Sequence, residues 1–126
     1  FLFMVDWSLV MSFGQRFIYN LSLGILTGAI ATDLDDAISD DLIYMSLAKS
    51  SSGNKSIGKK EWLRSIRNNN GNHTPRFCLE VVYENDEIVV CKGTKIVNGA
   101  PQISVFCMNI DGEKITYVQH LTGPAY

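Results

Sequence analysis

The spacing of apolar residues changes near Pro75, and this change limits the folds that the chain can adopt. Before Pro75, apolar residues such as Phe17 and Leu21 recur mostly at intervals of three and four, the period of an amphipathic helix. After it, apolar and polar residues alternate, which is typical of strands with one buried face. Helices followed by strands predict an α+β fold.

Two helices are predicted before residue 42. The first ends at Gly28, a typical C-terminal stop, and is either one long helix or two pieces broken near Gly14. The second begins at Thr32, whose hydroxyl can cap its first turn, and ends at Asp40-Asp41. Leu42 then begins a first strand.

A third helix is predicted over Gly58–Arg67, after a polar, Ser-rich loop over Lys49–Ser56. Trp62 and Ile66 lie one turn apart on its inner face, and its cations lie mainly on the outer face. Four strands follow, separated by turns rich in Asn, Asp and Gly, which predicts an antiparallel meander. Their predicted ranges are Arg76–Glu84, Glu87–Val97, Gln102–Ile110 and Lys114–Thr122.

Length and charge narrow the class of protein. With 126 residues, 46% of them hydrophobic, we expect residues 1–126 to form one domain, with residues 1–11 as an N-terminal extension. Eleven Lys and Arg against thirteen Asp and Glu leave no basic excess for binding nucleic acid or an anionic membrane. Polar residues interrupt the N-terminal apolar stretch, so we expect no membrane span there.

Cysteine usage favours a cytoplasmic protein. The cysteines are odd in number and widely spaced, which argues against a disulfide framework and a zinc site; they are Cys78, Cys91 and Cys107. The alternative is a signal peptide that begins at Met11, with Phe17–Thr27 as its apolar stretch and Ala29–Ala31 as its cleavage site.

Three segments together resemble one known superfamily. They are Asp33–Tyr44 after the first helix, Gly58–Leu63, and the hairpin ending Asp111–His120. Their order and spacing, from about residue 12 onward, resemble the nuclear transport factor 2-like superfamily and, within it, the SnoaL-like group. The resemblance implies a cone-shaped, cystatin-like fold, in which N-terminal helices pack on a curved antiparallel sheet and enclose a pocket. It also implies a homodimer, which we expect to form through the outer sheet face.

The reactions known in this superfamily fit the sequence poorly. In ketosteroid isomerase-like chemistry the family's base falls on Ser46, and its buried acid falls near Val105. The tyrosine of the family's first helix falls near Leu21, and the neighbouring Tyr19 lies on another helix face. The Asp–Arg–Asp arrangement of the family's epoxide hydrolases is not matched either.

His120 is the candidate catalytic residue, because histidine titrates near neutral pH. The family's last strand directs Thr116, Val118, His120 and Thr122 into the pocket. His120 is then a general base or a hydrogen-bond donor to a ligand, or else a structural histidine. Cys107 lies on the same hairpin as His120, and a Cys–His pair would suggest nucleophilic chemistry. The alternative is that Cys107 is a buried cysteine of the strand. The expected ligand-binding residues are Tyr19, Tyr44, Ser46, Trp62, Val105, Cys107, Val118 and His120.

No metal or cofactor is expected. The aspartates at 33, 35 and 36 fit the negative charge favoured at a helix start, and those at 40 and 41 fit the following turn. The basic stretch Lys49–Arg67 reads as a solvated face, or as a patch for an anionic partner.

Two functions from different classes follow. The first is a SnoaL-like protein that binds a small apolar molecule in the pocket of the cone. A weak lyase, isomerase or cyclase activity at the same pocket is left open. The second is a non-enzymatic dimeric binding or scaffolding domain.

Overall fold

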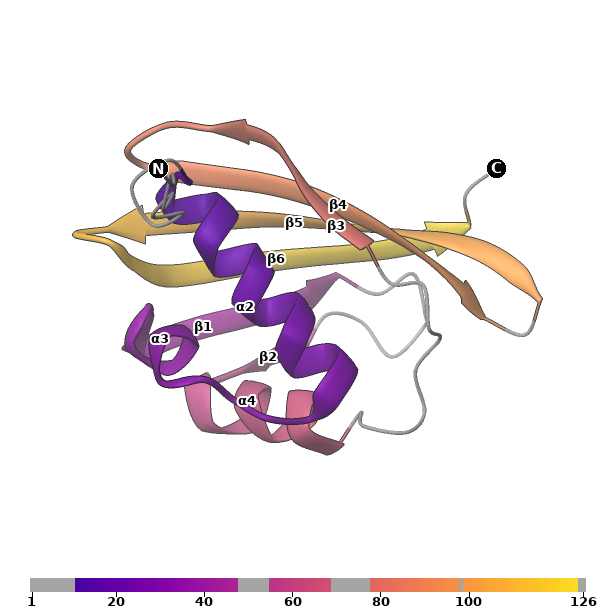
Figure 1. Cartoon of the computed structure of the whole chain (residues 1–126), viewed down its shortest axis with the longest axis horizontal. Helices are drawn as coiled ribbons and strands as arrows, with labels where there is room; N and C mark the ends of the chain where they lie inside the picture. The colour runs from indigo at the N-terminus through magenta and orange to yellow at the C-terminus, as the bar shows by residue number, and fades with distance from the viewer. Residues whose placement is uncertain (1–10, 48–54, 69–77, 98, 125–126) are drawn as a thin grey trace, which may run out of the picture.

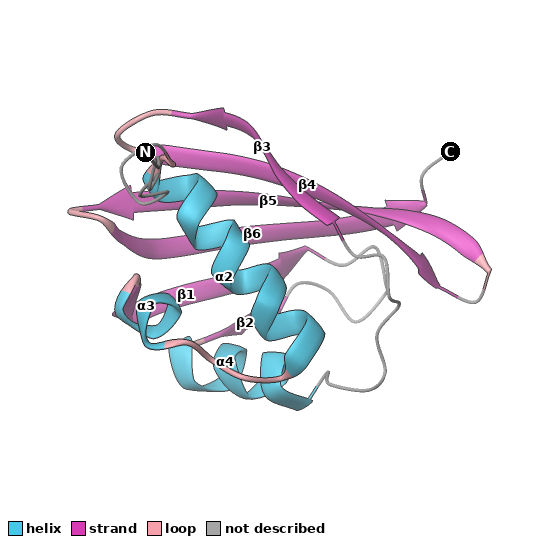
Figure 2. Cartoon of the chain, in the orientation of Figure 1, coloured by secondary structure: helices cyan, strands magenta, loops and turns pink. Residues whose placement is uncertain are grey.

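A computed structural model describes residues 11–47, 55–68, 78–97 and 99–124 of the chain. Within these ranges the helices are α2 (Phe13–Thr27), α3 (Thr32–Asp36) and α4 (Lys59–Asn68). The strands are β1 (Ile38–Leu47), β2 (Lys55–Ile57), β3 (Cys78–Glu84), β4 (Ile88–Val97), β5 (Ala100–Asp111) and β6 (Lys114–Pro124). The three described helices precede strands β3 to β6 in the sequence (Figures 1 and 2), so the predicted α+β class is confirmed.

The strands form one six-stranded sheet in the order β2-β1-β6-β5-β4-β3. Strands β3 to β6 make the antiparallel meander predicted from their turns. One pair departs from the fully antiparallel expectation, because β1 runs parallel to β6, with Ser46 opposite His120. A long connection separates these two strands in the sequence, and parallel pairing needs such a connection.

Helix α2 crosses one face of the sheet (Figure 1). It begins with a capping box, in which the Ser12 hydroxyl accepts from the Gln15 amide and the Gln15 side chain accepts from the Ser12 amide. It ends at Gly28, which is in the left-handed conformation with φ 75°, as the sequence predicted. Phe17 and Leu21 are almost completely buried on the side that faces the sheet.

The described part of the first helix begins at Phe13, next to Gly14, and an earlier helical piece would lie outside the described residues. Gly14 has a packing role at this helix start. It allows the helix to approach β3, because a Cβ atom at this position would lie 2.8 Å from the Oε1 atom of Glu84. The Glu84 carboxylate accepts hydrogen bonds from the Gly14 amide at 2.9 Å and from the Ser12 hydroxyl at 2.5 Å. The glycine therefore marks the point where the helix start docks on the sheet.

The chain around residue 36 differs from the prediction. Ala31, and not Thr32, is the N-cap residue of α3, and it makes no side-chain cap. The helix ends at Asp36, and β1 begins at Ile38 instead of Leu42. Ile38 is fully buried and lies opposite Ile115 of β6, so burial against the sheet outweighs continuation of the helix.

Two further corrections concern the segment before and within α4. The short strand β2 overlaps the end of the stretch predicted as a loop, and it pairs with β1 through Ile57 and Tyr44. Lys59 was expected on the outer face of α4, yet its ammonium lies 2.7 Å from the Asp35 carboxylate. It also donates to the main-chain carbonyl groups of Asp35 and Ile38, so it ties α4 to the junction of α3 and β1.

One hydrophobic core joins the helices to the sheet. It includes Phe17 and Leu21 of α2, Trp62 and Ile66 of α4, and side chains from one face of the strands. We call this covered face of the sheet the inner face and the opposite one the outer face. No helix in the described ranges is long and apolar enough to cross a membrane.

Candidate functional site

The β5–β6 hairpin and β1 present a row of side chains on the inner face. Met108 and Val118 are fully buried and lie opposite each other, which identifies the residues of β5 and β6 that face the helices. Because side chains alternate along a strand, the neighbouring inner pairs follow from the register. They are Phe106 opposite His120, and Ser104 opposite Thr122.

Four polar side chains on this face form a hydrogen-bonded chain, which we call the inner network. The Tyr44 hydroxyl of β1 bonds to Nδ1 of His120. The other ring nitrogen of His120, Nε2, lies 3.1 Å from the Thr122 hydroxyl. The Thr122 hydroxyl in turn lies 3.3 Å from the hydroxyl of Ser104, which is only 2% exposed.

The proton on Tyr44 determines the hydrogen-bond directions at a neutral His120. Burial raises the pKa of the Tyr44 hydroxyl to about 12, so this group stays protonated near neutral pH. A neutral His120 then accepts from Tyr44 at Nδ1 and donates from Nε2 to Thr122. Between Thr122 and Ser104 either hydroxyl can be the donor.

Aromatic rings surround the inner network on two sides. Phe106 stacks on the His120 ring, with centroids 4.0 Å apart and planes 12° apart. Trp62 of α4 stacks on Tyr44, with centroids 5.0 Å apart. Phe17 of α2 follows at 6.5 Å from Trp62. The polar chain is therefore held between rings from three structural elements.

Comparison with known structures identifies the architecture. One similar structure is an NTF-2 like protein of unknown function from Burkholderia xenovorans LB400, with a TM-score of 0.66 and 17% identity over 90% of this chain and 85% of that chain. An isomerase candidate from Rhodopseudomonas palustris has a TM-score of 0.65 and 13% identity over 90% and 91% of the two chains. An NTF2-like protein of unknown function from Shewanella baltica OS155 has a TM-score of 0.62 and 8% identity over 97% and 100%.

The chain has the nuclear transport factor 2-like fold. This confirms the fold that the resemblance implies, a cone-type arrangement of helices on a curved sheet. No family model and no curated protein matches the sequence. At such low identity the structural neighbours establish the fold alone.

The nuclear transport factor 2-like fold brings five of the predicted ligand-binding residues together. The Tyr44 ring contacts both the Trp62 ring and the His120 ring, so it joins the three residues. Ser46 lies beside His120 on the neighbouring strand and is half-buried. Val118 is fully buried one inner position away from His120, where it packs in the core.

Three predicted residues lie elsewhere. Val105 and Cys107 alternate with the inner-facing Phe106, so they lie on the outer face, away from His120. This placement removes the proposed pairing of Cys107 with His120. Tyr19 is 58% exposed on α2 and lines a groove of about 650 Å³ beside Leu79 of β3.

Two members of the inner network, Ser104 and Thr122, and the adjoining ring of Phe106 were not among the predicted ligand-binding residues. Thr122 was expected to face the pocket, and the hairpin register places Ser104 and Phe106 on the same face. A register shift near Asn109 changes the alternation at the other end of β6. There Ile115 is fully buried on the inner face. Thr116, which was predicted to face the pocket, is not part of the inner row.

Other candidate chemistry on the described residues is limited. Burial raises the pKa of the Cys91 thiol to about 12, which keeps this inner-face cysteine protonated and unreactive. No group of three or more His, Cys, Asp or Glu side chains within the described ranges could hold a metal ion. Asp35 and Asp40 both lie within 4 Å of the Lys59 ammonium, so part of the acidic run serves ion pairing.

Proposed function

We propose that the inner network binds a small, mostly apolar molecule that carries a polar oxygen atom. The observation that supports this proposal is the chain of four hydrogen-bonding side chains held between aromatic rings. Small-molecule sites typically combine apolar walls with a few convergent polar groups. The rings of Phe106 and Trp62 would contact the apolar body of the ligand.

Thr122 is the member of the network that a ligand would replace. It is exposed, whereas Ser104 is buried and Tyr44 and His120 are half-buried. A ligand carbonyl or hydroxyl in its position would accept from Nε2 of His120. The ligand would then keep every buried polar group of the network in a hydrogen bond.

This binding mode would also allow weak lyase or isomerase chemistry. Both ring nitrogens of His120 are engaged, so the histidine can exchange a proton with a ligand only when Thr122 is displaced. Tyr44 would position the ring through Nδ1 and stabilise its charged form by accepting a hydrogen bond. If the ligand binds at this site without reacting, the protein would act as a carrier or receptor domain.

Fluorescence of Trp62 offers a direct test, because this ring stacks on Tyr44. A Trp7→Phe variant would isolate its signal, and hydrophobic ketones and carboxylic acids would be titrated against it. We expect a ligand to change the emission, and Tyr44→Phe or His120→Phe to weaken its binding about tenfold, the effect of a lost buried hydrogen bond. Tyr83→Phe, on an exposed tyrosine, is the matched control.

Equal affinity in Tyr44→Phe, His120→Phe and the control would contradict the proposal. A panel in which every compound leaves the Trp62 emission unchanged would contradict it as well. A proton-exchange assay in D2O with a bound ketone would then separate an enzyme from a binding domain.

We also propose a homodimer through the outer face. In the register of the sheet, Met45, Val90 and Cys107 lie in one outer row, and Leu121 lies in the next. Leu121 is 46% exposed, so a second copy of this face would cover apolar surface. Sedimentation at micromolar concentration should show twice the 14.0 kDa monomer mass, and a Leu121→Glu variant should sediment as the monomer. A monomer at all concentrations would overturn this part.

A further inference from the structure

A groove of about 650 Å³ is lined by helix α2 and by β3, the strand at one edge of the sheet (Figure 1). Ile18 and Tyr19 line it from α2, and Leu79 and Val81 line it from β3. Tyr19 is 58% exposed, and both β3 residues are only partly buried. None of the four residues of the inner network lines this groove. It is therefore a separate surface, and its exposed apolar side chains favour an occupant.

The groove follows the free edge of β3. Leu79, Glu80 and Val81 are consecutive, so their side chains alternate between the two faces of the sheet. Because all three line the groove, it extends along the edge of the strand. β4 pairs with β3 on the other side, and no strand of the described ranges pairs with this edge. The main-chain groups of such an edge can pair with an extended segment of polypeptide.

The chain enters α2 from this groove. Met11 lines the groove, and its carbonyl accepts a hydrogen bond from the Arg16 guanidinium at 3.0 Å. Ser12 is the N-cap residue of the helix and has an extended backbone, with ψ 167°. Because Ser12 is not helical, the chain leaves the axis of α2 at this point, with Met11 in the groove.

The ten residues before Met11 match this groove in composition. They lie outside the described ranges, and only Asp6 and Ser8 among them are polar. Within Val5–Leu9, apolar and polar residues alternate, a pattern that gives an extended segment one apolar side. That apolar side would carry Trp7, the largest side chain of the segment.

Distances along the chain bring Trp7 level with Tyr19. Tyr19 lies eight residues after Met11, about 12 Å away at the rise of a helix. Trp7 lies four residues before Met11, about 13 Å away in extended form. An extended segment that runs back along the groove therefore reaches the exposed tyrosine. Its covalent attachment also gives it an effective concentration of about a millimolar, which favours the groove of its own chain over that of a second copy.

We propose that residues 1–10 of the chain cover this groove, with Trp7 packed against Tyr19 and Leu79. The apolar side of Val5–Leu9 faces the groove, and the main chain of this segment pairs with the free edge of β3. The contact buries apolar side chains of both partners. It also protects an edge strand from pairing with other chains.

Fluorine NMR of the full chain, labelled with 5-fluorotryptophan, tests this proposal, because the two tryptophans give one signal each. A Trp7→Phe variant assigns the signals, and Trp62, which lies in the core, reports whether each variant remains folded. We expect the Trp7 signal to show a smaller isotope shift between H2O and D2O than it shows in urea. Tyr19→Glu should at least about double this isotope shift, because it places a charge in the groove.

Leu23→Glu is the matched control. Leu23 is another exposed apolar residue of α2, one turn beyond Tyr19, and it does not line the groove. This variant and His120→Phe should leave the Trp7 signal unchanged, so the result is independent of ligand binding at the inner network. A Trp7 signal at its urea position, or an equal response to Tyr19→Glu and Leu23→Glu, would overturn the proposal. A Trp7 signal that moves toward its urea position on dilution would overturn it as well, in favour of docking on a second copy.

Discussion

The inner and outer faces of the β5–β6 hairpin differ in composition and burial, although alternating residues of the same strands form both. Inner positions such as Phe106 and Met108 are 4% and 0% exposed. Outer positions such as Val105 and Cys107 are only half-buried, and Leu121 is exposed. The polar chain from Tyr44 to Ser104 lies entirely on the inner face. A shift of one residue in the strand register would exchange these two sets of residues.

The strongest test of this difference compares two consecutive residues of β5. We predict that Phe106→Ala lowers the free energy of unfolding by about 3–5 kcal/mol, because it leaves a cavity in the core beside His120. Val105→Ala should lower it by less than about 1 kcal/mol, since its side chain lies on the half-buried outer face. Urea denaturation of both variants measures the two values. Equal losses would contradict the register of β5.

Much of this difference could be predicted from the sequence. The turn at Asp111-Gly112 and the alternation along the last strand place His120 and Val118 on one face, as the structure has them. Val105 was predicted in the pocket because the resemblance places the family's buried acid near it, and Cys107 because it shares the hairpin of His120. The register pairs them with Leu121 and Gln119, on the outer face. That register depends on the exact strand ends, which local residue preferences define poorly.

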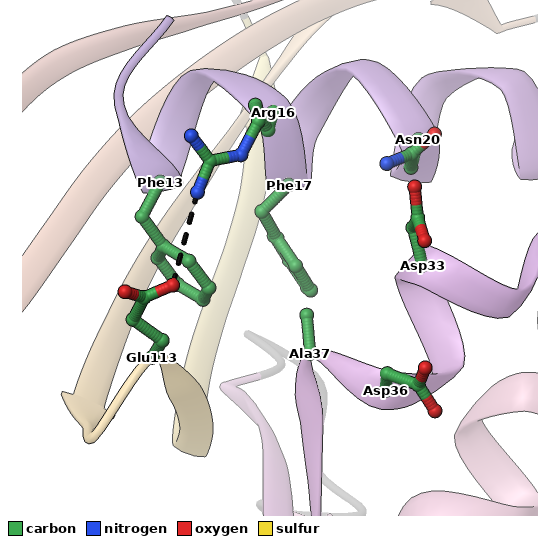
Figure 3. Close-up of a pocket in the computed structure, with 8 residues that line it drawn as sticks. All are labelled: Phe13, Arg16, Phe17, Asn20, Asp33, Asp36, Ala37 and Glu113. Carbon is green, nitrogen blue, oxygen red and sulfur yellow. Dashed lines mark ion pairs between the residues drawn. The ribbon is translucent and has the colours of Figure 1, made fainter. Parts of the chain in front are cut away.

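Long-range contacts explain what else the sequence could not reveal. Ile38 and Ile115 are far apart in the chain, and their mutual burial decides where β1 begins. The packing role of Gly14 depends on the Glu84 carboxylate of β3, which is distant in the sequence. The hollow that Phe17, Asp33 and Glu113 line likewise depends on α2 and the β5–β6 turn meeting α3 (Figure 3).

Thiol reactivity provides a second test of the two faces. Cys91 lies on the inner face with 0% exposure, and burial raises its pKa to about 12, whereas Cys107 is a half-buried outer residue. In a Cys78→Ser background at pH 8, and at a protein concentration too low for the proposed dimer, iodoacetamide should modify Cys107 at least about a hundredfold faster than Cys91. Mass spectrometry of the digested protein measures both rates. Faster modification of Cys91 in the folded protein would mean that the faces are reversed. Protection of Cys107 that grows with protein concentration would support the outer-face dimer.

The same contrast between neighbours occurs on α4. Lys59 is half-buried and Lys60 is exposed, so we predict that Lys59→Met costs about 1–3 kcal/mol of stability and Lys60→Met almost nothing. Burial alone would lower the pKa of the Lys59 ammonium, but hydrogen bonds and charges from Asp35 and Asp40 raise it above its ordinary 10.5. The stabilisation by Lys59 is therefore complete below pH 10.5 and is lost as the pH rises through the higher folded-state value.

Thermal unfolding of the wild-type and Lys59→Met chains at pH 8 and at pH 11 or above would measure this dependence. The difference between the two chains should shrink at the higher pH. A difference that grows with pH would show that the ammonium is not what binds the carbonyl groups of Asp35 and Ile38.

The smallest effect is expected at the turn that sets the register of the hairpin. Gly112 and Glu113 form a two-residue turn in which both have positive φ, 59° and 62°, a conformation that costs a non-glycine residue energy. We predict that Glu113→Gly stabilises the fold by about 0.5–1 kcal/mol. The lost pairing with Arg16 should offset little of this, because the 3.8 Å contact is largely exposed. Urea denaturation would show the gain, and the amide chemical shifts of Phe106 and His120 should stay unchanged. A loss of stability, or shifts along both strands, would mean that Glu113 and not the turn geometry maintains the register.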